Sequence, residues 1–151
     1  MKYLLITITL LFFLACSKSN PIPKKEFIKT TYLSPQELKQ LNFNGQNIVP
    51  IKIKNNFYYV RKDGKKMLTL TYDGEADAFS NGLARTKING KIGFFNNNLE
   101  IILKPIYDFA FPFHNGIAEI CVGCKEKSNG ETSLLSGGKW KKINRDGLVI
   151  E

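Results

Sequence analysis

A block of sequence occurs twice in this chain of 151 residues, and the repetition limits what the chain can fold into. Each copy opens with Tyr-Asp and continues with an Ala, a Phe and a Gly-aliphatic-Ala triplet. The first copy contains Tyr72-Asp73, Ala76, Phe79 and Gly82-Leu83-Ala84, and the second contains Tyr107-Asp108, Ala110, Phe113 and Gly116-Ile117-Ala118. The offset is 35 residues at the Tyr and 34 at the Gly, so one deletion separates the copies. A period of this length predicts stacked supersecondary units.

A second block, an apolar strand followed by a tight turn, can be placed three times. Its copies span residues 56–64, 91–98 and 139–147, and in the last two the turn leads into a further apolar strand at 101–103 and 148–150. Short runs of Ile, Val, Phe and Tyr separated by Asp-Gly or Asn-Gly are typical of β-hairpins. We therefore expect an all-β domain of mainly antiparallel hairpin repeats, in which each hairpin needs a neighbour to cover its apolar face.

The segment before the repeats contains one helix signal. Ser34 is a capping residue, Pro35 occupies the first helical position, and Glu37 follows three residues after the cap. These residues predict one short helix over 35–41, whose leucines pack on the sheet, and a strand at 48–53. Both elements are expected to cap the N-terminal end of the array.

Together the blocks resemble the WG-repeat family, also called KWG repeats. The resemblance covers about residues 56–151, and the naming dipeptide is degraded, because Ile92-Gly93 keeps only the Gly and Trp140-Lys141 keeps only the Trp. Phe57-Tyr58 keeps neither. The resemblance implies a β-rich repeat fold, and it implies no particular reaction. The equivalence of Tyr58, Gly93 and Lys141 suggests that this position faces outward.

The first 15 residues have the features of a secretory signal. A charged start precedes an apolar run at 4–15 that is too short, at about 1.5 Å per residue, to cross roughly 30 Å of hydrocarbon. Phe13-Leu14-Ala15-Cys16 resembles the lipobox of bacterial lipoproteins, which implies lipidation of Cys16 and a membrane anchor. Ordinary secretion and an uncleaved anchor are the alternatives. We expect a bacterial cell-envelope location. Ser17, rather than Asp, follows the cysteine, and by resemblance to the sorting rule of many Gram-negative lipoproteins this implies the outer membrane if the organism is Gram-negative.

Cleavage leaves a tether at residues 16–25, which is polar and contains two prolines, and a single β domain at 26–151. It removes one of the 22 basic residues and none of the 13 acidic residues, so the net charge falls from +9 to +8. Such a charge favours acidic partners such as lipid headgroups, acidic polysaccharide or acidic protein, whereas nucleic acid is not expected outside the cell. Alternatively, the lysines only keep the domain soluble.

Cys121 and Cys124 remain for an oxidising compartment, where a local disulfide is the default. Redox catalysis would need a lowered thiol pKa, usually from a helix N-terminus, whereas a strand at 117–120 precedes these cysteines. A zinc site would need four ligands, and beyond two thiols and His114 only carboxylates are available. The Gly-rich insert at 123–138 is expected to form an exposed loop, used for recognition or simply tolerated.

The remaining candidates favour structural roles. No phosphate loop, Gly-x-Ser-x-Gly or His-Glu-x-x-His motif occurs. Asp73 and Asp108 recur at equivalent positions, which favours structural hydrogen bonds in turns. His114 is expected in a surface turn, and the aromatic residues at 57–59 are expected mainly in the core.

We therefore predict no enzyme, no cofactor and no metal. The predicted function is a lipid-anchored, non-catalytic binding or interaction module of the cell envelope, whose partner is a protein or an acidic polymer. Two alternatives remain open. One is a thiol/disulfide redox factor or metal-binding protein that uses Cys121 and Cys124, and the other is a structural accessory subunit of an envelope complex.

Overall fold

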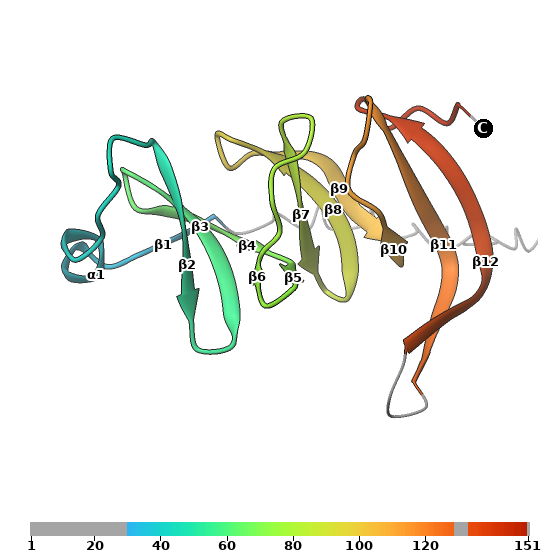
Figure 1. Ribbon diagram of the computed structural model, residues 1–151, viewed down its shortest axis with the longest axis horizontal. Coiled ribbons are helices and arrows are strands. Elements are labelled where there is room, and N and C mark those ends of the chain that lie inside the picture. The colour runs from blue at the N-terminus through green and yellow to red at the C-terminus, as the bar shows by residue number, and fades with distance from the viewer. Residues whose placement is uncertain (1–29, 129–132, 151) are drawn as a thin grey trace, which may run out of the picture.

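Antiparallel hairpins follow one another along the long axis of the molecule (Figure 1). The computed structural model describes residues 30–128 and 133–150. Its elements are β1 (Thr31–Tyr32), α1 (Pro35–Lys39), β2 (Ile48–Ile53), β3 (Asn56–Arg61), β4 (Lys65–Thr69), β5 (Thr71–Tyr72), β6 (Glu75–Ala76), β7 (Leu83–Ile88), β8 (Lys91–Asn96), β9 (Ile101–Tyr107), β10 (Phe109–Ala110), β11 (Ile117–Ser128) and β12 (Ser133–Asn144). The predicted all-β, mainly antiparallel fold with one short helix is confirmed.

Three sheets carry the repeats. The first sheet has the strand order β1-β4-β3-β2, the middle sheet β7-β8-β9 and the terminal sheet β10-β11-β12, while β5 and β6 form a small ribbon. Each of the three sheets contains one copy of the strand-and-turn block, in β3, β8 and β12 respectively. Figure 1 shows the sheets in chain order, with α1 at one end and the β11–β12 hairpin at the other. One repeat therefore corresponds to one step from sheet to sheet.

The helix α1 forms where its capping signal predicts. The Ser34 hydroxyl accepts a hydrogen bond from the Glu37 amide at 3.3 Å, and the Glu37 carboxylate accepts one from the Ser34 amide at 2.8 Å. The helix ends at Lys39, earlier than predicted, because the amides of Gln40 and Leu41 bond carbonyls three residues back and tighten the last turn. No helix in the described residues is long and apolar enough to cross a membrane.

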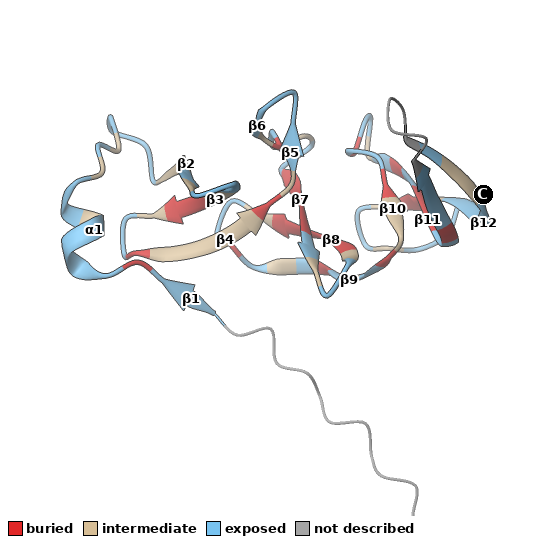
Figure 2. Ribbon diagram, turned by 90° about the horizontal axis from the view of Figure 1, so that it is seen from below, coloured by how far each residue is buried: buried red, intermediate tan, exposed pale blue. Residues whose placement is uncertain are grey.

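The recurrent Phe of each repeat anchors neighbouring sheets together. Phe79 packs against Tyr59 of the first sheet and Phe95 of the middle sheet, with ring centroids 4.7 and 5.5 Å apart. Phe113 packs against Phe94 of the middle sheet at 4.8 Å. Adjacent residues Phe94 and Phe95 thus belong to two different cores, one on each face of β8. Figure 2 shows the buried segments concentrated in the strands where sheets meet.

A buried ion pair joins the middle sheet to the next repeat. The Asp77 carboxylate accepts hydrogen bonds from the Arg85 backbone amide at 2.9 Å, from Nε at 3.0 Å and from Nη2 at 2.5 Å. Arg85 Nη1 donates to the Ala110 carbonyl in β10 at 2.9 Å. The pair therefore fixes the position of the terminal sheet as well as its own turn.

Gly93 is buried, so the predicted outward orientation is wrong for this copy of the repeat. A Cβ at this position would lie 2.6 Å from the Leu103 carbonyl oxygen and 2.7 Å from the Pro105 nitrogen. The register between β8 and β9 shifts at the same point. The backbone of β9 occupies the space of a side chain, and only glycine fits there.

Two further expectations about the C-terminal part are corrected. The insert at 123–138 is not an exposed loop, because β11 and β12 continue as a paired ribbon from Ile117↔Asn144 to Ser128↔Ser133. Residues 129–132 of the insert lie outside the described residues. The segment 148–150 is not a strand, since it has only an isolated bridge between Val149 and Ile143.

A candidate binding face on the terminal sheet

Cys121 and Cys124 form a disulfide within β11, with their Cα atoms 6.0 Å apart. Residues three apart in a regular strand face opposite sides of a sheet, so this bond requires a local irregularity. Gly123 provides it with a φ of 82°. A Cβ on the facing Gly138 would lie 2.6 Å from Cys121 Sγ and 2.7 Å from Cys124 Sγ. The disulfide therefore packs directly on the Gly138 backbone.

Asp108 holds this irregular segment in place. Its carboxylate accepts a hydrogen bond from the Gly123 amide at 2.6 Å and forms an ion pair with Lys91. The Lys91 hydrogen bond, followed by the Gly123 amide, lowers the pKa of Asp108 from its ordinary value of 3.8. Asp73, its counterpart in the sequence, instead lies in an exposed Asp-Gly turn with a φ of 49°. The structural hydrogen bond predicted for both residues is therefore present at Asp108.

The disulfide does not have the setting of a reactive Cys-x-x-Cys pair. Cys121 is fully buried and Cys124 is 8% exposed, and both lie within a strand rather than at a helix N-terminus. His114 lies in the surface turn that precedes β11, as predicted. Among the described residues, no group of three or more His, Cys, Asp and Glu side chains is placed to hold a metal ion. Cys16 lies outside the described residues, so its lipidation stays a prediction.

Three aromatic side chains, Phe109, Phe111 and Trp140, form an aromatic cluster on the outer face of the terminal sheet. Their ring centroids lie 5.0 to 6.1 Å apart, and the planes of Phe111 and Trp140 are inclined by only 30°. Phe111 is 46% exposed and Trp140 45% exposed. Phe109 and Trp140 pair with Cys121 from opposite sides, so the cluster lies beside the disulfide.

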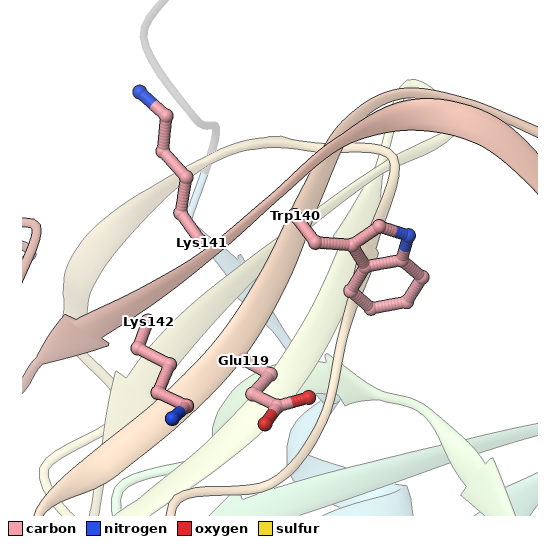
Figure 3. Close-up of a pocket in the computed structure, with 4 residues that line it drawn as sticks. All are labelled: Glu119, Trp140, Lys141 and Lys142. Atoms are coloured by element: carbon pink, nitrogen blue, oxygen red, sulfur yellow. The ribbon is translucent and has the colours of Figure 1, made fainter. Parts of the chain in front are cut away.

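Two shallow hollows border the aromatic cluster. The first, about 230 Å³, is lined by Glu119, Trp140, Lys141 and Lys142. The second, about 410 Å³, is lined by Phe111, Pro112, His114, Ile117, Glu119 and Lys142. Figure 3 shows Glu119 and Lys142 side by side near Trp140, whereas Lys141 extends away from them. Because Glu119 and Lys142 line both hollows, the hollows form one continuous surface.

Equivalent positions on the middle sheet are covered by the next repeat. Leu83, Ile92 and Phe94 are buried against the terminal sheet, and Arg85 reaches the Ala110 carbonyl there. The corresponding residues of the terminal sheet are, in the same order, Ile117, Trp140, Lys142 and Glu119. In the described part of the chain, no further sheet covers them. The outer face of the terminal sheet is thus equivalent to a repeat interface, but Lys142 stands in place of the apolar Phe94 and Glu119 in place of Arg85.

The aromatic cluster is not a remnant of this interface. Phe109 and Phe111 occupy the positions of Glu75 and Asp77 in the preceding copy, so two acidic residues have been replaced by aromatic ones. Sequence reasoning missed the cluster because it concentrated on Phe57–Tyr59, where Tyr59 is buried as expected and the other two are half-buried. A residue-by-residue alignment of the two copies would have revealed the cluster, because it shows these two replacements of acidic by aromatic residues.

The fold and this face define a β-repeat module, in which successive hairpin units share cores and the last described unit has an outer face that no other described sheet covers. The family described as WG containing repeat matches residues 59–91 and 92–125, so the resemblance drawn from the sequence is confirmed for these two copies. The match ends before the third strand-and-turn block at Trp140. No curated protein and no solved structure matches the chain.

Proposed function

We propose that this chain is a non-catalytic binding module of the bacterial cell envelope, anchored by a lipid on Cys16, which binds its partner with the outer face of the terminal sheet. One observation carries the proposal. No other sheet of the described residues covers the outer face of the terminal sheet, whose equivalent on the middle sheet is buried against the next repeat, and this outer face bears three clustered aromatic rings. Exposed apolar surface of this kind, bordered by charged residues, is typical of interaction sites.

The charges on this face support a ligand rather than a further repeat. Tyr59 and Phe94, at equivalent positions of the first two copies, pack against the anchoring Phe of the following block. The terminal sheet has Lys142 at this position. An ammonium group is costly to bury in an apolar core, so the residue disfavours another stacked sheet. Terminal repeats generally have such polar outer faces, but they do not need an aromatic cluster.

The membrane anchor is supported by the sequence. The lipobox-like Phe13-Leu14-Ala15-Cys16 follows a short apolar segment, and the polar residues 16–25 would separate the lipid from the domain. Intact mass of the chain purified from bacterial envelopes tests this part. A mass that includes acyl chains on Cys16 supports the anchor, and an unmodified chain, or one that keeps residues 1–15, contradicts it.

Retention on envelope material tests the binding face. The acylated chain, in detergent, would be mixed with delipidated envelope material from cells that lack it. We expect the unaltered chain to be retained and a Phe111→Ser/Trp140→Ser variant to be lost. Tyr32→Ser/Tyr72→Ser is the matched control, because it removes two exposed aromatic residues, 57% and 63% exposed, outside the terminal sheet. Equal retention of all three proteins would contradict the proposed face.

A structural accessory subunit of an envelope complex is the second candidate. It is favoured by further exposed apolar residues on the terminal sheet, namely Ile117, Val122 and Leu134. A subunit would copurify with a fixed stoichiometric partner after mild detergent extraction, whereas a binding module would be retained by ligand without one. Mass measurement of the extracted assembly separates the two.

A further inference from the structure

We infer that the outer edge of β12 is a strand-addition site, at which an extended acidic peptide of a partner protein pairs antiparallel with residues 134–141. This site lies beyond the proposed function, because it is the backbone edge of the terminal sheet and not the aromatic cluster on its outer face. Three features point to it: the pairing of the equivalent strands, the direction of the β12 backbone groups, and the position of two lysines.

The equivalent strands of the two preceding sheets have a neighbour on the side that β12 leaves open. Trp140 is equivalent to Phe57 in β3 and to Ile92 in β8. Phe57 pairs antiparallel with β4, and Ile92 pairs antiparallel with β9. On the corresponding side of β12, the described residues supply only an isolated bridge at Ile143 (Figure 1). Residues 134–141 therefore form an edge of about 26 Å on which no described strand lies.

The backbone of β12 directs hydrogen-bonding groups to this edge. The Lys142 carbonyl accepts a hydrogen bond from the Ile150 amide at 2.9 Å. The Asn144 amide donates to the Leu148 carbonyl at 3.0 Å, so the backbone groups of alternate β12 residues point away from β11. By the same alternation, the N–H and C=O of Trp140 point to the outer edge, and no strand of the described residues lies opposite them. An added strand would pair with these groups, as β4 and β9 do in the preceding sheets.

Two lysines make this edge selective for an acidic strand. Strand pairing places Lys139 beside Val122 and Lys141 beside Ile120, on the side of β12 opposite to Trp140. Both lysines are exposed, and Figure 3 shows Lys141 and Trp140 extending in different directions. Directly opposed side chains of an antiparallel pair lie on one face, so acidic residues opposite the lysines would form ion pairs, while the intervening residues would lie beside Trp140. The site thus favours a peptide in which acidic and apolar residues alternate.

A second copy of this chain is a poorer occupant of the edge. Antiparallel pairing of two β12 strands about Trp140 would place Lys139 of one protomer opposite Lys141 of the other, and like charges that are directly opposed destabilise a strand pair. Lysines on an edge strand are a common protection against pairing between copies. The same lysines attract an acidic strand, so they exclude one occupant and favour the other.

Synthetic peptides test the site on the full mature chain. The probe is an acetylated and amidated peptide of alternating Glu and Val. Trp140 is the only tryptophan of the chain, so its fluorescence reports on binding at this edge. We expect a saturable change in Trp140 emission with this peptide and none with a peptide of alternating Lys and Val. Hydrogen exchange at the Trp140 backbone amide should also slow in the complex, because an added strand would pair with that amide.

N-methylated peptides separate backbone pairing from attraction between charges. In the expected register, the amides of the Val residues, which lie on the side of Trp140, are directed to β12, whereas the amides of the Glu residues are directed to solvent. A peptide that is N-methylated at every Val should therefore lose binding, and one that is N-methylated at every Glu should keep it. Equal binding of the two methylated peptides would overturn the inference, and so would a failure of the unmethylated peptide to bind.

Lys139→Gln/Lys141→Gln should weaken binding of the Glu-Val peptide by about tenfold. Lys54→Gln/Lys62→Gln is the matched control, because it removes the same charge from exposed turns of the first sheet, and it should leave binding unchanged. Protection of the Trp140 amide without peptide that disappears on dilution would assign the edge to a second copy and contradict the inference.

The outcomes also separate this site from the proposed function. If no peptide binds but Phe111→Ser/Trp140→Ser still abolishes retention on envelope material, the strand-addition site fails and the proposed function stands. If the Glu-Val peptide binds as expected and that variant is nevertheless retained, the strand-addition site stands and the proposed binding face fails.

Discussion

Replacement of Asp77 by Ala should destabilise the fold strongly, because it leaves a buried guanidinium without its counter-charge. The Asp77 and Arg85 side chains are 4% and 7% exposed. The Asp77 carboxylate accepts three hydrogen bonds from Arg85, and all three are lost with the carboxylate. Among the described residues, the Ala110 carbonyl is the one hydrogen-bond partner that the guanidinium keeps.

The expected loss is about 3–5 kcal/mol, the usual cost of removing one member of a buried ion pair. For a domain of this size, it corresponds to a fall in melting temperature of about 10–20 °C. The change should loosen the middle sheet from the terminal sheet, because Arg85 joins the two through Ala110. We therefore expect the aromatic cluster to lose order with the ion pair.

Thermal and urea unfolding of the full mature chain, followed by circular dichroism and by Trp140 emission, measure the loss. An Asp77→Leu/Arg85→Met double variant is the essential comparison for Asp77→Ala, because it removes both charges and so leaves no unpaired charge buried. It should be more stable than Asp77→Ala, and the two single substitutions should not add. A loss below about 1 kcal/mol for Asp77→Ala, or a double variant as unstable as the sum of the singles, would refute the reasoning.

Three other changes test the terminal and middle sheets. Gly138→Ala should destabilise the chain by about 1–3 kcal/mol and raise the free-thiol count, because the new Cβ would clash with both sulfurs of the disulfide. Gly137→Ala is the control: Gly137 has a similar φ, but a Cβ there meets open space, so the disulfide should still form. Thr86→Val should stabilise the chain by about 1 kcal/mol in urea unfolding, because it removes a buried hydroxyl that has no hydrogen-bond partner among the described residues. The equivalent Ile120 is already apolar, and a loss of stability would contradict this account. Because the pKa of Asp108 is lowered in the folded chain, its carboxylate adds stability above about pH 4, and this stability is lost as the pH falls further. The Asp108→Asn variant should therefore have a lower melting temperature than the unaltered chain at pH 7, and the two melting temperatures should converge in acid. Asp73→Asn controls for loss of a carboxylate, and a difference that persists at low pH would disprove the linkage.

The parts of the fold that the sequence predicts well are those with local signals. Ser34, Pro35 and Glu37 define a helix start without help from the rest of the chain. Asn81-Gly82 and Asn115-Gly116 have positive φ at both residues, as hairpin turns of this sequence require. The strand at Ile48–Ile53 is also found where it is predicted.

Expectations that depend on neighbouring strands were less accurate. The insert at 123–138 was expected to be a loop from its Gly and Ser content, yet β11 and β12 pair along it through their backbones, which needs no apolar pattern. Gly93 was expected to face outward because Tyr58 and Lys141 share its position, but its burial depends on where β9 crosses β8. The aromatic cluster is visible in the aligned copies, whereas its exposure depends on which sheet covers which, and that is a property of the whole array.

The position of the disulfide gives it a more specific role than holding the fold together. A bond that closes a loop of four residues contributes only about 2 kcal/mol by chain entropy. However, Cys121 lies between Phe109 and Trp140 across the terminal sheet, so the bond fixes the strand from which the aromatic cluster is built. A rigid surface binds more tightly than a mobile one with the same contacts, because less entropy is lost on binding. In the proposed binding module, Cys121 and Cys124 therefore have a structural role: their disulfide keeps the binding face rigid. The sequence had left a redox role for the same two cysteines as an alternative.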